Sequence, residues 1–178
     1  MQITDIKTIR LRASLAPERQ MHSRSGQRTH RSALLVQVET DEGVTGIGSC
    51  SGNGAILEVM IERIFKPLLL GKNPLKVEEL WEISYFRSVA KEFGSRGLGV
   101  VALSGVDIAL WDILGKVKRQ PVFQLLGGAA RDKVPVYATA LYPEEPSEVV
   151  KKAHAFARKG FRAVKIKVGF DLAQDVVI

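Results

Sequence analysis

Two lysines near the end of the chain have the type and spacing of an acid–base pair. Lys165 and Lys167 flank a single isoleucine within a run of β-forming residues. Because side chains two apart on a strand point to the same side, we expect both amines on one face. Val164, Ile166 and Val168 would then share the other face. If that apolar face packs beneath helices, the amines point towards the centre of a sheet or barrel, a place normally filled by apolar residues.

Proton chemistry is one reason to place two amines side by side. Each ammonium group disfavours the charge of the other and burial acts in the same direction, so the pKa of both is expected to fall. A lysine whose pKa is about 7–8 can act as a general base near neutral pH. The alternative is an edge strand whose lysines face water and discourage aggregation. The spacing of Lys165 and Lys167 alone leaves both interpretations open.

A basic segment nearer the N-terminus is the second candidate for ligand binding. It has no acidic residue between Glu18 and Glu39, and its basic residues are Arg19, His22, Arg24, Arg28, His30 and Arg31. The serine, glycine and glutamine between them predict a mobile loop. With a formal charge of +7 on the chain, this loop could be a nucleic-acid-binding arm, a lid over a small anion or a solvated surface. It lacks an aromatic residue that would stack on a base.

Composition is typical of a globular protein. The chain has 178 residues, 46% hydrophobic and 25% charged, which is enough apolar material for a sizeable core. The single cysteine, Cys50, excludes an intrachain disulfide and is interpreted as a small residue near a strand end rather than a nucleophile. The N-terminus is unlike a signal peptide, and we find no apolar run of about 20 residues. We therefore expect a cytoplasmic protein without a membrane partner.

Residues 1–132 have the pattern of an α+β domain. Alternating apolar residues predict a three-stranded antiparallel meander, with strands over 3–12, 32–39 and 44–48. A second exposed loop follows at 51–54, where serine, asparagine and glycine cluster. The period then becomes helical, and helices are expected over 55–65, 75–89 and 100–118. In the first of these, Ile56, Val59, Met60, Ile64 and Phe65 are expected to line one face.

Residues 133–178 follow a different pattern. A strand over 134–139, a helix from Pro146 with Ser147 as its N-cap, and a strand over 161–169 predict a βαβ unit. Another helix starts near residue 171. Because parallel sheets are normally buried on both faces, two strands alone do not form a stable sheet. We therefore expect this second part to be incomplete.

The helix over 100–118 and the residues after it carry a family resemblance. This segment closely resembles the first signature of the mandelate racemase and muconate lactonising enzymes, a branch of the enolase superfamily. The residues in register are Ala102, Ser104, Gly105, Asp107, Ala109, Asp112, Gly115, Lys116, Pro121, Leu125 and Gly127. The meander before the signature and the Lys-x-Lys strand after it occur in the order that this family uses. The resemblance thus spans essentially the whole chain.

The signature helix is expected to have a packing role. Asp107 and Asp112 are five residues apart and do not share a helix face well, which speaks against a metal-binding pair. Asp112 and Lys116 are four apart and can form an ion pair. Gly105 and Ala109, at the same spacing, would let another element approach closely.

The resemblance implies a fold and a chemistry for the complete enzyme. Residues 1–132 would be an α+β capping domain, and 133–178 the first βαβ portion of a truncated (β/α) TIM-type barrel. The family uses Mg²⁺ to stabilise the enediolate formed when a proton α to a carboxylate is removed. Its metal ligands lie on later barrel strands, so none is expected within this chain. Lys167 would be the catalytic base, with Lys165 assisting it, and the fragment alone is expected to be inactive.

The resemblance also assigns substrate binding to two capping-domain loops, here at about 14–31 and 49–54. The candidate residues are His22, Arg24, His30, Ser51 and Asn53. An electropositive lid suits a small carboxylate such as a sugar acid, and so we expect an acid-sugar dehydratase. A racemase, epimerase or cycloisomerase of the same family remains an alternative. A basic nucleic-acid-binding module using loop 19–31 is the alternative of a different class. Members of this family are often symmetric oligomers, so the complete enzyme is expected to be a homo-oligomer.

Overall fold

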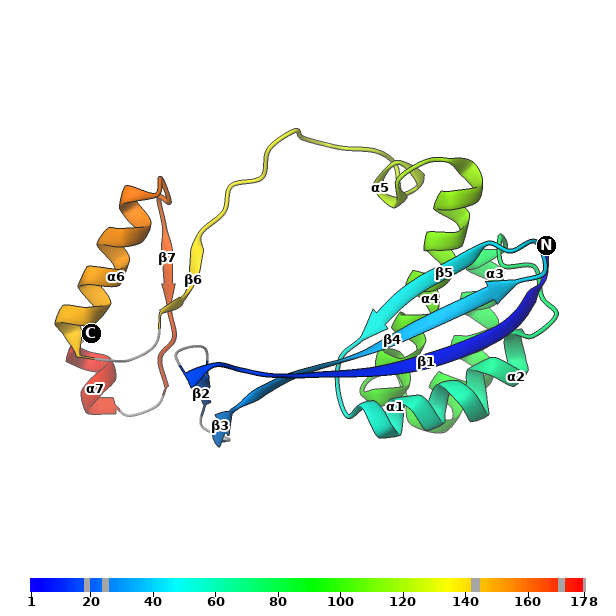
Figure 1. Ribbon diagram of the computed structural model, residues 1–178, viewed down its shortest axis with the longest axis horizontal. Coiled ribbons are helices and arrows are strands. Elements are labelled where there is room, and N and C mark those ends of the chain that lie inside the picture. The colour runs from blue at the N-terminus through cyan, green and yellow to red at the C-terminus, as the bar shows by residue number, and fades with distance from the viewer. Residues whose placement is uncertain (18–19, 24–25, 142–144, 170–171, 178) are drawn as a thin grey trace. The chain divides into compact units, whose positions relative to one another are not determined.

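The computed structural model describes residues 1–17, 20–23, 26–141, 145–169 and 172–177 (Figure 1). They fall into two compact units. The first contains Met1–Gln20 and Thr29–Ala129, and the second contains Met21–Arg28 and Ala130–Ile178.

The first unit is built on a three-stranded antiparallel sheet. Its order is β1 (Ile3–Ser14), β4 (His30–Thr40) and β5 (Thr45–Cys50), with β4 in the centre. Leu34, Val36 and Val38 of β4 are buried, as expected where alternate residues of a strand face a core. The three-stranded meander predicted from sequence is confirmed, and β1 and β4 continue past the end of β5 as a two-stranded ribbon that reaches the pair Ser14 and His30.

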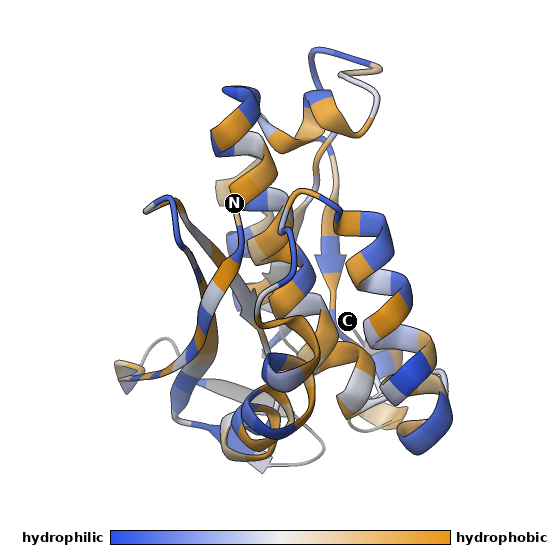
Figure 2. Cartoon of the chain, turned by 90° about the vertical axis from the view of Figure 1, so that its right-hand side faces the viewer, coloured by the Kyte–Doolittle hydropathy of each residue, from blue (hydrophilic) through white to orange (hydrophobic). Residues whose placement is uncertain are grey.

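Helices cover one face of this sheet (Figure 1). They are α1 (Gly54–Met60), a π-helical segment η2 (Ile61–Phe65), α2 (Lys66–Leu69), α3 (Val77–Ser84), a second π-helical segment η3 (Tyr85–Phe93), α4 (Leu98–Lys118) and α5 (Val122–Leu125). Figure 2 shows hydrophobic and hydrophilic residues gathered on different sides of the helices. The apolar sides join the sheet in one core.

The core face of the first helix agrees with the sequence prediction in part. Met60 and Phe65 are buried and Ile64 packs against the core, as expected. Ile56 and Val59, expected to face the core, are 45% and 58% exposed, whereas Leu57 and Ile61 are fully buried. In a regular α-helix, residues four apart do not lie directly above one another, because a turn takes 3.6 residues. The wider turn of η2 (Ile61–Phe65) brings residues four apart closer to the same side. The helical path also continues past Pro67 to Leu69, because the proline follows the π-turn at the start of α2, where its missing N–H costs little.

Helix α4 lies against β5 at van der Waals distance. A Cβ atom added at Gly46 would come within 2.1 Å of the Ala109 carbonyl oxygen, and one at Gly48 within 1.9 Å of the Gly105 carbonyl oxygen. The predicted close approach at Gly105 and Ala109 is therefore confirmed, and glycines on the strand make it possible. No side chain fits between these two backbones.

The outer edge of β5 is closed by two charged residues of α4. Lys116 Nζ donates to Asp112 Oδ2 at 2.7 Å, so the predicted ion pair is confirmed. The same carboxylate accepts from the Ile47 N–H at 2.8 Å, and the same ammonium donates to the Thr45 carbonyl at 2.7 Å. These bonds satisfy backbone groups that an edge strand would leave open.

Among the described residues, α4 is the one helix that meets the length and composition of a membrane span. Its 21 residues, with a mean hydropathy of 1.7 in the most apolar window, are long and apolar enough to cross a membrane by length and composition. Half of that window is buried inside the unit. This burial is what a core helix of a folded domain shows.

The second unit contains a parallel strand–helix–strand element. Strands β6 (Ala138–Leu141) and β7 (Val164–Ile166) are parallel and are connected through α6 (Pro146–Arg158), which confirms the predicted βαβ pattern. A further helix, α7 (Leu172–Val177), follows. A short antiparallel hairpin, β2 (Met21–Ser23) and β3 (Gly26–Arg28), belongs to the same unit.

Three local predictions for this unit were wrong. The first strand occupies 138–141 rather than 134–139, and Pro135, which has no N–H to donate, precedes it. Helix α6 has Glu145 as its N-cap and Pro146 in its first turn, so Ser147 is not the cap. The basic segment 19–31, predicted as a mobile loop, forms the hairpin β2–β3 and the first residues of β4 in its described part. The polar side chains of this segment predicted a loop, although its backbone groups pair regularly in the hairpin.

Candidate functional site at the end of strand β7

Lys165 and Lys167 follow the alternation expected of one strand. Lys165 is the central residue of β7, and Lys167 comes one residue after its end. The Lys167 N–H still donates to the Leu141 carbonyl at 2.9 Å, so the parallel pairing with β6 extends to this residue. In such an extended segment both side chains emerge from the same face.

The aromatic ring of Tyr137 lies beside the first lysine. Lys165 Nζ is 5.5 Å from the centroid of the Tyr137 ring, within the range of a cation–π contact. Ala138, Leu141 and Val149 of α6 are buried, so the unit has a small apolar core between strand and helix. Sequence reasoning did not select Tyr137. Its position in an apolar run was visible, but only the register between β6 and β7 places it next to Lys165.

The amines of the pair are accessible in this unit. Lys165 and Lys167 are both exposed. The unit contains two parallel strands among its described residues and therefore has no opposite wall that would enclose them. Their enclosure in a barrel interior stays a prediction.

Of the capping-loop candidates, two have defined partners. His30 begins β4, and its Nδ1 lies 3.3 Å from Arg12 Nη2. Asn53 is the N-cap of α1, where its Oδ1 accepts from the Ile56 N–H at 3.5 Å. The Asn53 side chain thus has a structural task in addition to any role in binding.

The remaining loop candidates have no described contacts. Ser51 is exposed in the turn before α1. His22 is in β2, but its side chain lies outside the described residues, as does the whole of Arg24.

Two arginines that sequence reasoning passed over lie next to these loops. Arg12 contacts His30, and the side chain of Arg10 lies 3.6 Å from the Cβ position of Gly54. Arg10 Nε is 3.3 Å from Glu58 Oε2 on α1. Both arginines alternate with apolar residues in β1, and this pattern resembles an ordinary solvent-facing strand. Their guanidinium groups add positive charge where the β1–β4 ribbon leaves the sheet.

The other titratable candidates in the first unit are structural. Burial raises the pKa of the Cys50 thiol, which keeps it protonated and argues against a nucleophile. Asp112 is engaged by Lys116 and the β5 backbone. Asp107 is half-buried, and this burial raises the pKa of its carboxyl group.

The described residues do not provide a metal centre. Among them there is no group of three or more His, Cys, Asp and Glu side chains that could hold a metal ion. The donor set available to the structure therefore does not fit Mg²⁺, and no step of the chemistry can be assigned to a metal on these residues.

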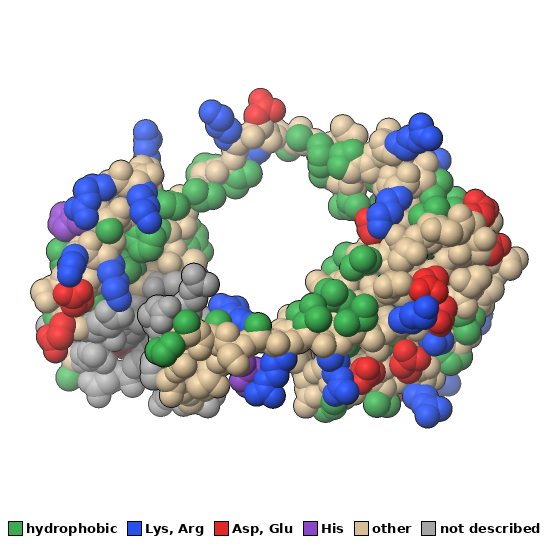
Figure 3. All heavy atoms as spheres, viewed as in Figure 1, with side chains coloured by type: hydrophobic (Ala, Val, Ile, Leu, Met, Phe, Trp, Pro, Cys, Tyr) green, Lys and Arg blue, Asp and Glu red, His purple; other side chains and the backbone are tan. Residues whose placement is uncertain are grey.

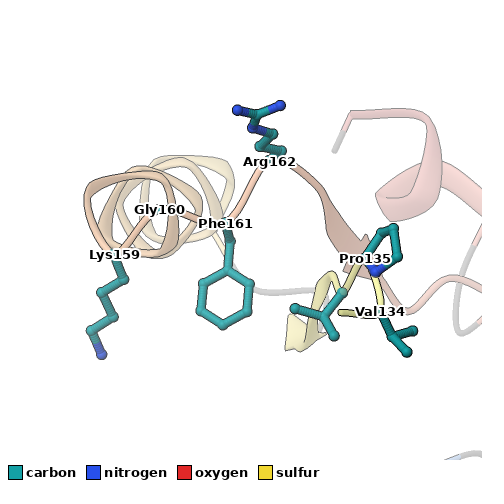
Figure 4. Close-up of a pocket in the computed structure, with 7 residues that line it drawn as sticks. Val134, Pro135, Lys159, Gly160, Phe161 and Arg162 are labelled. Carbon is teal, nitrogen blue, oxygen red and sulfur yellow. The ribbon is translucent and has the colours of Figure 1, made fainter. Parts of the chain in front are cut away.

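A cavity in the second unit lies away from the lysine pair. Its volume is ≈ 510 Å³, and it is lined by Val134, Pro135, Val136, Lys159, Gly160, Phe161 and Arg162. The Phe161 ring points towards the valine–proline segment and Arg162 points away (Figure 4). All of these residues precede β6 or β7, whereas ligands of parallel α/β folds bind at the carboxyl ends of strands. Lys167, which follows β7, is at the end where such sites form.

The surface of the second unit is rich in basic groups. Lysine and arginine side chains gather over α6 (Figure 3). Helix α6 carries Lys151, Lys152 and Arg158, and Lys159 is its C-cap. They are on the helix rather than on the strand that carries the lysine pair.

Comparison with known proteins gives these features a family. The pattern of the mandelate racemase / muconate lactonizing enzyme N-terminal domain matches residues 5–127. The chain belongs to the mandelate racemase / muconate lactonizing enzyme family. The matched segment contains β4, β5, all of α4 and all but the first two residues of β1. The glycine contacts and the Asp112–Lys116 pair described above are therefore features of a domain of this family.

Two enzymes illustrate the relatives of the chain. Arabinonate dehydratase of Saccharolobus solfataricus is 35% identical over 94% of this chain and 46% of its own length. D-galactarolactone cycloisomerase of Agrobacterium fabrum is 35% identical over 99% of this chain and 46% of its own length. The chain thus spans about half the length of the curated relatives that it matches.

Solved structures give the same result for the fold. A provisionally assigned mandelate racemase from Bordetella bronchiseptica RB50 has a TM-score of 0.91 and 38% identity, over 98% of this chain and 45% of that one. A racemase from Streptomyces coelicolor A3(2) with bound magnesium has a TM-score of 0.83 and 34% identity, over 98% of this chain and 49% of that one. The predicted capping-domain architecture is confirmed by these likenesses.

Proposed function

We propose that this chain is the N-terminal portion of a magnesium-dependent acid-sugar dehydratase that removes the proton α to a carboxylate. The observation that carries the proposal is the pair Lys165 and Lys167, spaced to share one face of a parallel strand in a chain of this family. The family assignment and the likeness to arabinonate dehydratase support the reaction class. On its own, the 178-residue chain would be inactive.

Lys167 is the proposed base. Its neutral amine takes the proton from the α-carbon, and the electron pair of the broken C–H bond passes into the carboxylate to give an enediolate. Lys165, which we place beside the carboxylate, would pair with the substrate oxygens. Collapse of the enediolate then expels the β-hydroxyl group as water, with a proton from an acid not assigned in this chain. Bound Mg²⁺ would neutralise charge on the carboxylate oxygens, and we place its ligands outside residues 1–178.

Sugar acids are the proposed substrate class. The capping loops include the guanidinium group of Arg12 and the neighbouring imidazole of His30, which suit an anionic, hydroxyl-rich ligand. Cycloisomerisation is the second candidate, and the likeness to D-galactarolactone cycloisomerase over 99% of the chain favours it. We further propose a cytoplasmic homo-oligomer, as expected of such a metabolic enzyme.

The test uses the protein at full family length. Proton exchange at the α-carbon in D₂O and formation of product are followed for a panel of aldonic and aldaric acids with Mg²⁺. Lys167→Ala is expected to lower both rates by about 10²–10⁴-fold, the range for loss of a general base. The matched control is Lys159→Ala, which lies at the other end of the strands. Unchanged exchange in Lys167→Ala would exclude this residue as the base.

The panel also separates the reaction classes. A dehydratase releases a 2-keto-3-deoxy acid, and a racemase or epimerase exchanges the α-proton without loss of water. A cycloisomerase opens or closes a ring in the substrate, also without loss of water. The nucleic-acid alternative predicts duplex binding that falls steeply with added salt. We expect no such binding at physiological salt.

A further inference from the structure

The two asparagines of the chain are followed by residues of opposite chemistry. Asn53 precedes Gly54, and Asn73 precedes Pro74. Both asparagines are exposed. The carbon of a side-chain amide can be attacked by the peptide nitrogen of the next residue, because the two then close a five-membered ring. Proline has no N–H to lose, whereas glycine has no side chain to hinder the attack, so the chain contains one reactive asparagine and one unreactive asparagine.

The N-cap of α1 restrains Asn53 only weakly. Its Oδ1 accepts from the Ile56 N–H at 3.5 Å, which is longer than the usual range of such bonds. Its backbone is extended, with ψ at 98°, and its carbonyl accepts from the Leu57 N–H at 3.0 Å. Closing the ring requires a different ψ, so the first turn of α1 has to open. Helix ends fray, and α1 begins directly after Asn53.

Packing does not require a glycine at position 54. A Cβ atom there would meet only the Arg10 side chain, at 3.6 Å, which is an ordinary van der Waals distance. At Gly48, by contrast, the added atom would lie 1.9 Å from a backbone oxygen. Gly54 is also not among the glycines with a positive φ. Alanine should therefore fit at position 54 and leave the fold unchanged, while its side chain hinders the peptide nitrogen.

We propose that Asn53 and Gly54 form a site of spontaneous deamidation. The Gly54 nitrogen loses its proton to hydroxide and bonds to Cγ of Asn53, and the Cγ–Nδ2 bond breaks to release ammonia. Water then opens the resulting succinimide at Cγ to give aspartate, or at the main-chain carbonyl to give isoaspartate. The reaction needs only water and base, and it is independent of the lysine pair and of the proposed dehydration.

The two products affect α1 differently. Aspartate caps a helix as well as asparagine does, and its charge is favourable at a helix N-terminus. In isoaspartate the main chain runs through the side-chain carbon, which adds a methylene group before Gly54 and removes the capping geometry. Both products add one negative charge near Arg10, whose side chain lies 3.6 Å from the Cβ position of Gly54. This charge enters loop 49–54, so on the proposed function it would weaken binding of an anionic substrate.

The 178-residue chain is the sample for the test. It is incubated at mildly alkaline pH, its acidic species are separated by ion exchange, and tryptic peptides are identified by mass spectrometry. Trypsin places the two asparagines in different peptides, 32–63 and 73–76. We expect species with one extra negative charge, in which OH replaces NH₂ at Asn53 and not at Asn73. Enzymatic methylation of isoaspartate distinguishes the two products, and the chain unfolded in urea should convert faster because no cap restrains it.

Two variants locate the reaction. Gly54→Ala should keep the circular dichroism of the parent and remain predominantly unmodified in the time in which half of the parent converts. Asn53→Ser keeps an N-cap residue but has no amide, so it should form no acidic species at this position.

Two results would overturn the proposal. An Asn53 that stays unmodified in the folded chain while the urea-unfolded chain converts would show that the cap prevents ring closure. Equal conversion of the parent and of Gly54→Ala would show that the Gly54 nitrogen is not the nucleophile.

Discussion

The two units of the chain differ in how many of their backbone groups are hydrogen-bonded and how many of their apolar side chains are buried within the unit itself. In the first, β5 is closed on one side by β4 and on the other by Asp112 and Lys116. In the second, the buried hydrophobic residues among those described are only Ala138, Leu141 and Val149, whereas the first unit buries one large cluster between its sheet and helices. The family pattern matches 5–127, which covers most of the first unit and, of the second, only the hairpin segment 21–28.

This difference separates the residues that identify the family from those proposed to do its chemistry. The signature on α4 packs a helix onto a strand. Of its two acids, Asp112 pairs with Lys116 and Asp107 is half-buried. The lysine pair is on a short strand with a single parallel neighbour among the described residues. A strong sequence signature can therefore mark a packing requirement, while the catalytic candidates carry only the weak pattern Lys-x-Lys.

The glycine contact between β5 and α4 should be the most sensitive point of the first unit. In Gly48→Ala, the new Cβ would meet the Gly105 carbonyl oxygen at 1.9 Å, and backbone has to move. We expect a loss of about 3 kcal/mol in the free energy of unfolding, typical of overpacking without a flexible neighbour. Denaturant unfolding followed by circular dichroism measures it. Gly54→Ala is the control, since its Cβ meets only the Arg10 side chain at 3.6 Å. Equal midpoints for the two variants would contradict the close contact.

The closure of the β5 edge should matter less. Asp112→Ala removes the acceptor of the Ile47 N–H and the partner of Lys116. Both side chains are partly exposed, so water replaces some of these bonds, and we expect a loss of about 1 kcal/mol. Asp112→Asn keeps an acceptor oxygen and should recover part of it. The same denaturant series applies, and an alanine variant as stable as the parent would show that the edge does not need closing.

Local spacing was enough to predict the contacts of α4. Gly105 with Ala109, and Asp112 with Lys116, are each four residues apart, and a helix places such pairs on one face wherever it packs. The strand order also followed from alternation and turn residues, because a meander joins neighbours in sequence.

Features that depend on distant partners could not be predicted in this way. The π-helical turn η2, in which Ile61 and Phe65 are buried, depends on packing against the sheet. Ser84 and Ser88 are buried in the helical layer, where the Ser88 hydroxyl bonds the Ser84 carbonyl, and no hydrophobic pattern reveals such residues. At the candidate site, the spacing identified Lys165, but its contact with Tyr137 requires the register between two strands.

Two carboxyl groups of the first unit should respond to pH with opposite signs. The hydrogen bond from Lys66 lowers the pKa of Asp5 from 3.8, so its contribution to stability is present above that value and lost as pH falls through the lowered pKa. Burial raises the pKa of Asp107 from 3.8, so its contribution is present below that value and lost as pH rises through the raised pKa.

Single variants separate these two contributions. At pH 7, Asp5→Asn should be less stable than the parent and Asp107→Asn more stable, because the first loses an ion pair and the second an unpaired half-buried charge. Both differences should shrink as pH falls through the respective pKa. Thermal unfolding from pH 3 to pH 7 measures them. A destabilised Asp107→Asn at pH 7 would mean that the Asp107 carboxylate is stabilised by a partner.

The smallest effect is expected at the exposed contact between Tyr137 and Lys165. Tyr137→Leu removes the ring 5.5 Å from the ammonium group, whereas Tyr137→Phe keeps it. An exposed cation–π contact is weak, so amide exchange in β7 should speed up by only about twofold in the leucine variant and stay unchanged in the phenylalanine variant. The Lys165 side-chain resonances should shift in the leucine variant alone. If neither variant shifts these resonances, the Tyr137 ring does not contact the Lys165 ammonium group in solution, and the proposed cation–π contact is wrong.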